Sequence, residues 1–394
     1  MNTTATFNAP LSWLNRHLKG DPILWGIVLV LSILSLFVVY SATGTLAFKK
    51  MSGNTEYFLM KHGFLILVGL FFMWAAHRID YKYYSKLSLL ALCVSVPLLL
   101  FTWKFGSNIN EASRWITIPL INQTFQPSDL AKLALISHLA RMLSKRQHHI
   151  TDNWQTLIPI CLWCGGISGL IMLTNFSTGF LLFATCGLLM FIGRVPMKFL
   201  MMLVLIGTIC ASMALFFGQR SGTAISRIEQ FMDPKEVGYQ EEQAYIAIAT
   251  GEVFGKGPGN SDQRYFLPSP FSDFIYAIIL EEYGFIGGLL VVFLYLAFLY
   301  RGLVTVSKSL GAFGGLLSAG LCFSLVLQAM VNMGVAVGLG PVTGQPLPLL
   351  SMGGTSLIFT GISIGIILSV SRSYVEDKQK QTIAPPPVNI PANA

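Results

Sequence analysis

Ten apolar stretches, most of them near 20 residues long, constrain this chain more than any other feature of its sequence. A run of about 20 apolar residues crosses the hydrocarbon core of a bilayer as an α-helix. Composition agrees, since 53% of the 394 residues are hydrophobic and only 11% are charged, which excludes a soluble globular domain. We therefore predict an all-α polytopic membrane protein with about ten transmembrane helices. They are expected near residues 23–47, 58–77, 86–103, 127–143, 157–174, 176–193, 197–218, 273–300, 311–338 and 354–372.

The distribution of Lys and Arg predicts which loops face the cytoplasm. If the spans alternate in direction, most of the 26 Lys and Arg residues fall on the side that holds both termini. Cytoplasmic loops carry such an excess, so both termini are predicted to be cytoplasmic and the one long loop, residues 219–272, lies outside. The net charge of +8 follows from these basic loops, and we expect no nucleic-acid partner.

These patterns divide the chain into three parts. Residues 1–22 form a cytoplasmic segment with an interfacial amphipathic piece. Residues 23–374 form the transmembrane domain, and residues 375–394 are Pro-rich and predicted to be a disordered cytoplasmic tail.

Three acidic side chains follow the Gly/Pro-rich end of the long loop. Asp273 stands where the loop passes into the eighth apolar run, and Glu281 and Glu282 lie within that run. Ionisable groups inside a span are costly to bury and are therefore candidate functional groups. Aspartate is also a good helix N-cap. From the residue alone, Asp273 is either a helix cap or a functional carboxylate.

The long loop contains one amphipathic pattern, over residues 239–250. Tyr245, Ile246 and Ala249 fall on one side of the predicted helix, and Gln243 falls on its polar surface. We expect this helix to lie flat on the outer membrane surface. Arg227 and Arg264 stand elsewhere in the same loop and supply positive charge on the outer side.

The loop before the fourth span carries a second charged group. Pro127 is a favourable first residue of a helix, and Asp129 and Lys132 then share one helical face near its outer end. They are either a structural ion pair or an anion-handling lysine held by an acid. Arg114 lies earlier in the same loop, also on the predicted outer side.

Residues 341–356 are apolar but rich in Gly and Pro. Irregular backbone at membrane depth persists only where it is buried in protein or lines a wet cavity, so we expect a re-entrant or rim segment. Ser351, Gly353 and Gly354 lead into the last span. Either helix N-terminal amides face an anion there, or small residues allow close helix packing.

Four ordered motifs together resemble the SEDS family of polytopic peptidoglycan glycosyltransferases, over residues 23–374. They are Ser113-Arg-Trp-Ile116 with Gln126-Pro-Ser-Asp-Leu-Ala-Lys132, Gly255-Lys-Gly-Pro-Gly-Asn-Ser261, Ser272-Asp-Phe-Ile-Tyr-Ala277 with Glu281-Glu-Tyr-Gly284, and Pro341-Val-Thr-Gly344 with Ser351-Met-Gly-Gly-Thr-Ser356. Gly257-Pro-Gly-Asn-Ser261 and Ser269-Pro-Phe-Ser-Asp273 are more similar to the cell-division branch, particularly its Bacteroidetes-like forms, than to the elongation branch.

Three positions depart from the family pattern. Asp129 replaces the usual Glu after Gln-Pro-Ser, and Met352 replaces the usual Tyr in Ser-Tyr-Gly-Gly. The turn Asn175-Phe-Ser-Thr-Gly179 lacks the acid of the usual Pro-Asp-Leu-Gly.

The resemblance implies polymerisation of lipid II, an undecaprenyl-diphosphate-linked disaccharide peptide, at the division septum of the bacterial inner membrane. Asp273 matches the catalytic acid and would act as general base. Negative charge on the diphosphate leaving group needs cations, for which Arg114, Lys132, Arg227 and Arg264 are candidates. The other expected substrate-binding residues are Asp129, Gln243, Ser351, Gly353 and Gly354.

A divalent cation, Mg²⁺ or Mn²⁺, would suit a diphosphate substrate, with ligands that the sequence does not assign. The resemblance also implies a class B penicillin-binding transpeptidase, other divisome membrane proteins and membrane lipid as partners. Three alternatives stay open: a lipid II flippase, an elongation-type polymerase and a division scaffold. The clustering of charged residues at the outer side favours an enzyme over a flippase, which needs polar groups through the whole membrane depth.

Overall fold

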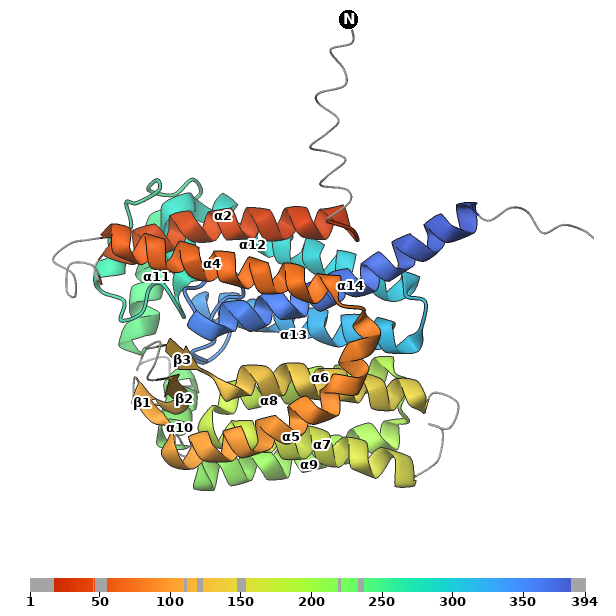
Figure 1. The fold of residues 1–394 in the computed structure, drawn as a ribbon. Coiled ribbons are helices and arrows are strands. Elements are labelled where there is room, and N and C mark those ends of the chain that lie inside the picture. Colours follow the sequence, from red (N-terminus) through yellow and green to blue (C-terminus); the bar gives the residue numbers. More distant parts are fainter. Residues whose placement is uncertain are drawn as a thin grey trace, which may run out of the picture.

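The computed structural model describes residues 18–44, 46, 55–109, 112–118, 123–146, 154–218, 221–232 and 237–383. Ten long helices run roughly side by side in this part of the chain (Figure 1). They are α2 (Pro22–Ala42), α4 (Thr55–Arg78), α5 (Tyr81–Phe105), α6 (Pro127–Lys145), α7 (Trp154–Thr174), α8 (Phe176–Ile192), α9 (Met197–Phe217), α12 (Ile275–Lys308), α13 (Ala312–Ala336) and α14 (Gly354–Ile383).

The predicted all-α membrane fold is confirmed. Eight of these helices are long and apolar enough to cross a membrane. The other two, α6 and α8, occupy predicted span positions. Helix α8 has only 17 residues, and α6 carries Asp129, Lys132, Arg141 and Lys145. Both pack against α7 and α13 rather than standing apart. For these two helices, a complete crossing of the membrane stays a prediction.

The long helices form two groups that share α13. Helices α2, α4, α12 and α14 pack on one another, and α5 to α9 form the second group (Figure 1). Helix α13 contacts α12 and α14 on one side and α6 and α8 on the other. The most extensive contact joins α4 and α14, where small residues let the backbones meet. A Cβ at Gly361 or Gly365 would clash with the carbonyl of Gly69 or Met73.

Shorter elements cover the end of the bundle opposite the start of α2 and the end of α14 (Figure 1). Strands β1 (Ser107–Ile109), β2 (Ala112–Ile118) and β3 (Gln123–Phe125) form an antiparallel sheet of order β1-β2-β3. The sequence pattern predicts only a loop here, so this sheet is a feature that the structure adds. Helices α10 (Ser221–Met232) and α11 (Tyr239–Gly251) and the 3₁₀ turn η1 (Gln263–Tyr265) come from the long predicted outer loop.

Two details of the sequence analysis need correction. Helix α11 exists where it was predicted, but its buried face is Glu241, Ala244, Ala247 and Gly251, which packs against α12. The expected apolar residues Tyr245 and Ile246 are each 37% exposed, because only small side chains permit this close helix contact. Helix α14 runs to Ile383, so residues 375–383 are helical rather than disordered. Residues 384–394 and the amphipathic piece up to residue 17 lie outside the described residues.

Helix α12 is interrupted at Gly284, whose φ of 65° and ψ of −169° are not helical. Residues 252–272, which we call the inserted loop, pass their backbone into this break. Four backbone hydrogen bonds join the inserted loop to α12. Lys256 N and Gly257 N donate to the carbonyls of Glu281 and Glu282, respectively (2.9 Å each). In the other direction, Phe285 N donates to Glu252 O (3.0 Å) and Ile286 N donates to Val253 O (3.3 Å). The inserted loop thus replaces helical partners that the break removes.

Candidate functional site

Residues 341–353, which we call the rim segment, are irregular yet largely enclosed by helices. Leu347 and Leu350 are buried, and the segment crosses between α12, α13 and α2 as expected for such backbone. Side chains of α2, α12 and α13 donate to four of its carbonyls. Asn332 donates to Gln345 O (2.7 Å), Gln328 to Pro346 O (2.8 Å), Tyr295 to Pro348 O, and Ser35 to Leu350 O (2.9 Å). These bonds give the segment a fixed shape.

Asp273 lies directly beside the rim segment. The Ser351 hydroxyl donates to the carbonyl of Ser272 (2.6 Å), and the Asn332 amide donates to the carbonyl of Asp273 (2.8 Å). The Asp273 carboxylate is half-buried and accepts a hydrogen bond from the Ser272 hydroxyl at Oδ1 (2.8 Å). The N-cap of α12 is Phe274, with no side-chain cap bond. The structure therefore does not support the interpretation of Asp273 as a helix cap.

Arg227 approaches the same point from α10. Its Nη1 donates to the carbonyl of Val342 (2.9 Å). A Cβ at Gly344 would lie 3.5 Å from Asp273 Oδ2 and 3.9 Å from Arg227 Nη1. Gly344, with a φ of 63°, thus separates a carboxylate from a guanidinium in a conformation that glycine adopts readily.

An apolar cavity of about 280 Å³ opens beside Arg227. Phe176, Phe180 and Leu181 of α8 line one side, and Val331 of α13 with Pro341 and Val342 of the rim segment line the other. A cavity of this character accepts hydrocarbon. Arg227 is part of its lining, and Asp273 lies near Arg227 across Gly344.

Asp129 and Lys132 form the predicted ion pair, with Lys132 Nζ 2.9 Å from Asp129 Oδ1. Lys132 Nζ also lies 3.5 Å from Gln328 Oε1, and Gln328 in turn holds the rim segment. Asp129 is 4% exposed, and its Oδ2 has no hydrogen-bond partner in the described part of the chain. Both side chains line a small polar cavity with Ser324, Ser356 and Thr360.

The starts of α6 and α14 meet near this ion pair. The backbone N–H of Gln126, just before α6, donates to the Thr355 hydroxyl in the first turn of α14 (3.3 Å). Helix N-termini attract anions. A Cβ at Gly354 would meet only Thr124 O at 3.9 Å, and one at Gly353 would meet Ser356 at 3.4 Å. Close helix packing therefore does not explain Gly354. Arg114 belongs to β2, and its side chain lies outside the described residues.

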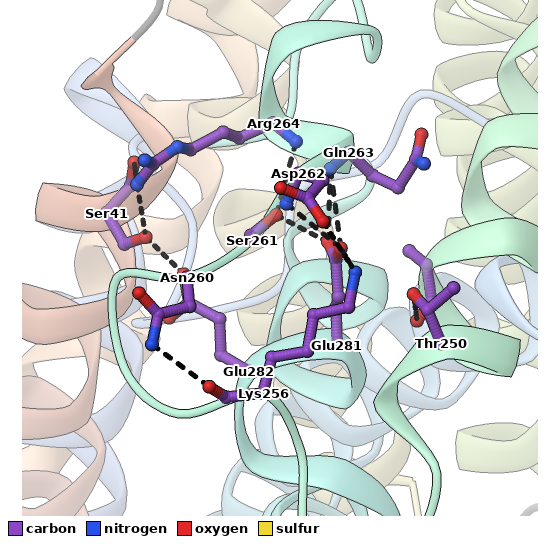
Figure 2. Close-up of polar contacts among 11 residues, drawn as sticks. Ser41, Thr250, Lys256, Asn260, Ser261, Asp262, Gln263, Arg264, Glu281 and Glu282 are labelled. Atoms are coloured by element: carbon purple, nitrogen blue, oxygen red, sulfur yellow. Dashed lines mark hydrogen bonds and ion pairs between the residues drawn. The ribbon is translucent and has the colours of Figure 1, made fainter.

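Arg264 and the two buried glutamates form a separate cluster (Figure 2). Glu281, 0% exposed, accepts from Lys256 Nζ (2.8 Å), Ser261 Oγ (2.5 Å) and the Asp262 N–H (3.0 Å). Glu282 accepts from the Ser41 hydroxyl. Arg264 Nη1 donates to Gly259 O (2.8 Å) and lies 3.3 Å from Ser41 Oγ. This cluster binds the inserted loop to α12 and α2.

Lys256 and Asp262, at the exposed side of this cluster, stabilise each other's charged forms. The hydrogen bond and charge of Lys256 lower the pKa of Asp262. Burial alone would lower the pKa of Lys256, but its bonds to Asp262 and Glu281 outweigh burial and raise it. The sequence marked both intramembrane glutamates as candidate functional groups. Glu281 is saturated with structural partners, whereas Glu282 Oε2 is buried without a hydrogen-bond partner among the described residues.

The structure adds residues that the sequence analysis did not select. Asn332, Gln328 and Gln345 connect Asp273 to the rest of the site, and Gln345 Nε2 donates to the Thr178 hydroxyl (2.5 Å). Two of these residues could have been selected from the sequence, because Gln328 and Asn332 are polar residues one helical turn apart in an apolar span. Gln243 lies half-buried on α11, and among the described residues no hydrogen bond joins it to Asp273.

A metal site made by the chain alone is not evident in the described residues, where no three His, Cys, Asp or Glu side chains gather. Asp273 contributes one half-buried carboxylate near Arg227. A single carboxylate is enough for many Mg²⁺ sites, in which one or two carboxylates and the substrate phosphates bind the ion together. The residues present fit a cation that arrives with a diphosphate.

Solved structures share this fold. One chain of a peptidoglycan synthase complex, described as coordinating polymerization and crosslinking, superposes with a TM-score of 0.69 at 22% identity and covers 91% of this chain and 99% of that one. The rod shape determining protein RodA of Thermus thermophilus superposes with a TM-score of 0.66 at 23% identity, over 90% and 97% of the two chains. The class is therefore a polytopic membrane protein with the RodA-like fold.

The family follows from sequence. Residues 21–376 match the family model of FtsW, RodA and SpoVE, described as cell cycle proteins, so the chain belongs to this family, the one its motifs resemble. A relative from Nitrosococcus halophilus, a probable peptidoglycan glycosyltransferase FtsW, is 33% identical over 361 residues, which cover 89% of this chain and 92% of the relative.

Proposed function

We propose that this protein polymerises lipid II into glycan strands during septal cell-wall synthesis. Family membership and relatives that carry the name FtsW support this proposal. The observation that carries it is the position of Asp273. Its half-buried carboxylate has one described side-chain hydrogen bond and lies near Arg227, which lines the apolar cavity.

The reaction assigns one role to each part of the site. Asp273 takes the proton from the attacking sugar hydroxyl, whose oxygen forms a bond to the anomeric carbon of a second lipid II. The bond from that carbon to the lipid diphosphate breaks, and the configuration inverts. Asp273 must therefore be accessible to the sugar hydroxyl, which its half-buried position allows.

The leaving diphosphate needs positive charge that is already in place. Lys132, Arg227 and the starts of α6 and α14 supply it, and Arg114 is a further candidate. A Mg²⁺ or Mn²⁺ ion, with Asp273 as its carboxylate, would add Lewis acidity at the diphosphate. The cavity lined by Phe176 and Phe180 would hold part of a polyprenyl chain.

The membrane setting and the partner are part of the same proposal. The positive-inside distribution supports an inner-membrane protein with both termini in the cytoplasm. In that orientation the rim segment and Asp273 would face the outer side, and the names of the relatives support a position at the septum. The fold similarity to a complex described as coordinating polymerization with crosslinking supports a class B transpeptidase as partner.

Reconstitution tests the proposal directly. The full chain is purified with its cognate transpeptidase, supplied with fluorescent lipid II, and the products are separated by size. Glycan strands are expected. If no strands form while proteoliposomes with the same protein move lipid II across the bilayer, the flippase alternative replaces the polymerase.

A further inference from the structure

A second polar pocket lies at the opposite end of the helical bundle, far along the helices from Asp273. It has a volume of about 250 Å³ and is lined by Lys19 before α2, His77 and Arg78 at the end of α4, and Arg372 and Glu376 of α14. Three cations face one acid, so the lining has a net positive charge with His77 neutral. None of these residues takes part in the site around Asp273.

The pocket is built from fixed elements. Gly20, with a φ of 102°, brings the chain against the Leu368 carbonyl, where a Cβ would lie 3.1 Å away. Lys19 pairs with Glu376 at 2.8 Å, and Arg372 Nη1 donates to the Arg78 carbonyl at the end of α4 (3.1 Å). The pocket therefore has a defined shape in which the cations are held.

Two groups in the pocket have hydrogen-bonding capacity left over. His77 is 0% exposed, and neither ring nitrogen has a hydrogen-bond partner among the described residues. The Leu368 carbonyl lies near the ring but outside hydrogen-bond geometry. Arg372 Nε is also buried without a described partner. Because unsatisfied buried donors are costly, a ligand with acceptor oxygens would complete this site.

An apolar surface leads away from the pocket along α4. Phe64, Leu67, Phe71 and Trp74 are 67%, 66%, 59% and 38% exposed, and their spacing puts them on one helical stripe that ends at Arg78. The Arg78 guanidinium lies over the Trp74 ring, 5.8 Å from its centroid. Tryptophan and arginine at the end of an apolar span mark the level of lipid headgroups.

We propose that this pocket binds the phosphate of an anionic phospholipid in the leaflet next to the chain ends, with its acyl chains along the α4 stripe. The phosphate oxygens accept from Arg372, His77 and Lys19, a combination of bidentate and point-charge donors suited to phosphate. A soluble phosphate would satisfy the same donors, but it would not use the apolar stripe. The site is independent of the proposed polymerase reaction.

Native mass spectrometry of the purified full chain in detergent can measure this binding. The probes are short-chain phosphatidylglycerol, short-chain phosphatidylcholine and inorganic phosphate. We expect saturable binding of phosphatidylglycerol in preference to phosphatidylcholine. Equal binding of the two lipids would overturn the proposal. Inorganic phosphate that binds as tightly and prevents lipid binding would assign the pocket to a soluble anion and also overturn it.

Substitutions that are expected to change the lipid affinity in opposite directions make the test specific. Arg372→Gln and Lys19→Gln should each weaken phosphatidylglycerol binding about fivefold, because each removes one cation near the membrane surface. Glu376→Gln should strengthen it by a similar factor, although it breaks the same ion pair with Lys19. The control is Lys82→Gln, an exposed residue at the same end of the bundle, which should change nothing.

Two outcomes contradict the assignment. Weaker binding in Glu376→Gln would mean that the ion pair, and not the pocket charge, matters. Equal loss in Lys82→Gln would mean non-specific attraction to the basic surface. Arg372 also holds the end of α4, so Lys19→Gln, at a side chain that is 43% exposed, decides the outcome if Arg372→Gln does not fold.

Discussion

Glu281 and Asp273 belong to the same short stretch of chain, but their surroundings differ in kind. Glu281 is fully buried and receives hydrogen bonds from a lysine, a hydroxyl and backbone amides of the inserted loop. Asp273 is half-buried, and its described side-chain partner is the neighbouring Ser272. A carboxylate whose oxygens are all occupied holds structure together, whereas one with open lone pairs can accept a proton from a substrate.

The loops beside these acids show the same contrast. Buried charge and a broken helix fix the inserted loop, and neutral amides and hydroxyls from α13, α12 and α2 fix the rim segment. Arg227 is the exception, because its guanidinium holds the Val342 carbonyl and puts a positive charge near Asp273. The comparison predicts that substitutions in the first region lower stability, and that those at Asp273 lower activity alone.

The largest effect is expected for Asp273→Asn. An amide cannot take the proton from the sugar hydroxyl, so polymerisation should fall by ~10²–10⁴-fold, the usual contribution of a general base. Thermal unfolding of the detergent-purified variant should match the unsubstituted protein, since Asp273 does not cap α12. Near-normal glycan synthesis would remove Asp273 from the chemistry.

Glu281→Gln should have the opposite effect to Asp273→Asn, lowering stability and not activity. Removing the charge breaks the ion pair with Lys256, which keeps Asp262 as a partner, and it weakens the buried hydrogen bonds at position 281, at a cost of about 1–3 kcal/mol. We expect a lower melting temperature with activity preserved per folded molecule, measured side by side with Glu242→Gln, an exposed acid on α11. An unchanged melting temperature with lost activity would contradict the structural role.

Lys132→Met tests whether the second ion pair is structural. The single substitution strands the buried Asp129 carboxylate, so reduced stability is expected in addition to about 10²-fold lower activity from the lost cation. The double variant Asp129→Asn with Lys132→Met removes both charges and should regain stability. If polymerisation returns with it, the lysine has no role in binding the diphosphate.

Gly284→Ala should destabilise the junction between α12 and the inserted loop by about 1–3 kcal/mol. Its φ is 65°, and a Cβ would lie 2.3 Å from the Val253 carbonyl. Gly354→Ala, at the start of α14, is the matched control because its Cβ would meet only an ordinary contact. Equal melting temperatures for the two variants would show that the break in α12 carries no strain.

The smallest effect is expected for Asp262→Asn at the exposed edge of the inserted loop. Lys256 lowers the pKa of Asp262, so this carboxylate stabilises the fold at pH values above about 3.9, the ordinary Asp pKa. Its contribution is lost as the pH falls through the lowered value. The melting temperature should therefore drop slightly at pH 7, and the difference from the unsubstituted protein should vanish in acid. A difference that grows in acid would contradict this.

The helical membrane fold could be predicted from the sequence because it depends on properties of short continuous segments. Each apolar run is long enough to span a bilayer, and the Pro and Gly residues around positions 127 and 341–354 mark a helix start and irregular backbone. The break at Gly284 was not predicted and is seen only in the structure. The Asp129–Lys132 pair followed from helical spacing alone. The family motifs indicated Asp273 in the same way.

Only the tertiary structure decided which acids are structural. Asp273, Glu281 and Glu282 are all carboxylates near one helix start, and nothing local shows that Lys256, Ser261 and Ser41 reach two of them. Asn332 and Gln328 acquire their roles from residues of the rim segment that follow in the chain but fold back onto α13. The basic pocket likewise needs Lys19, Arg78 and Arg372 from three distant segments. Hydrogen bonds and burial depend on distances between segments, which the order of residues does not fix.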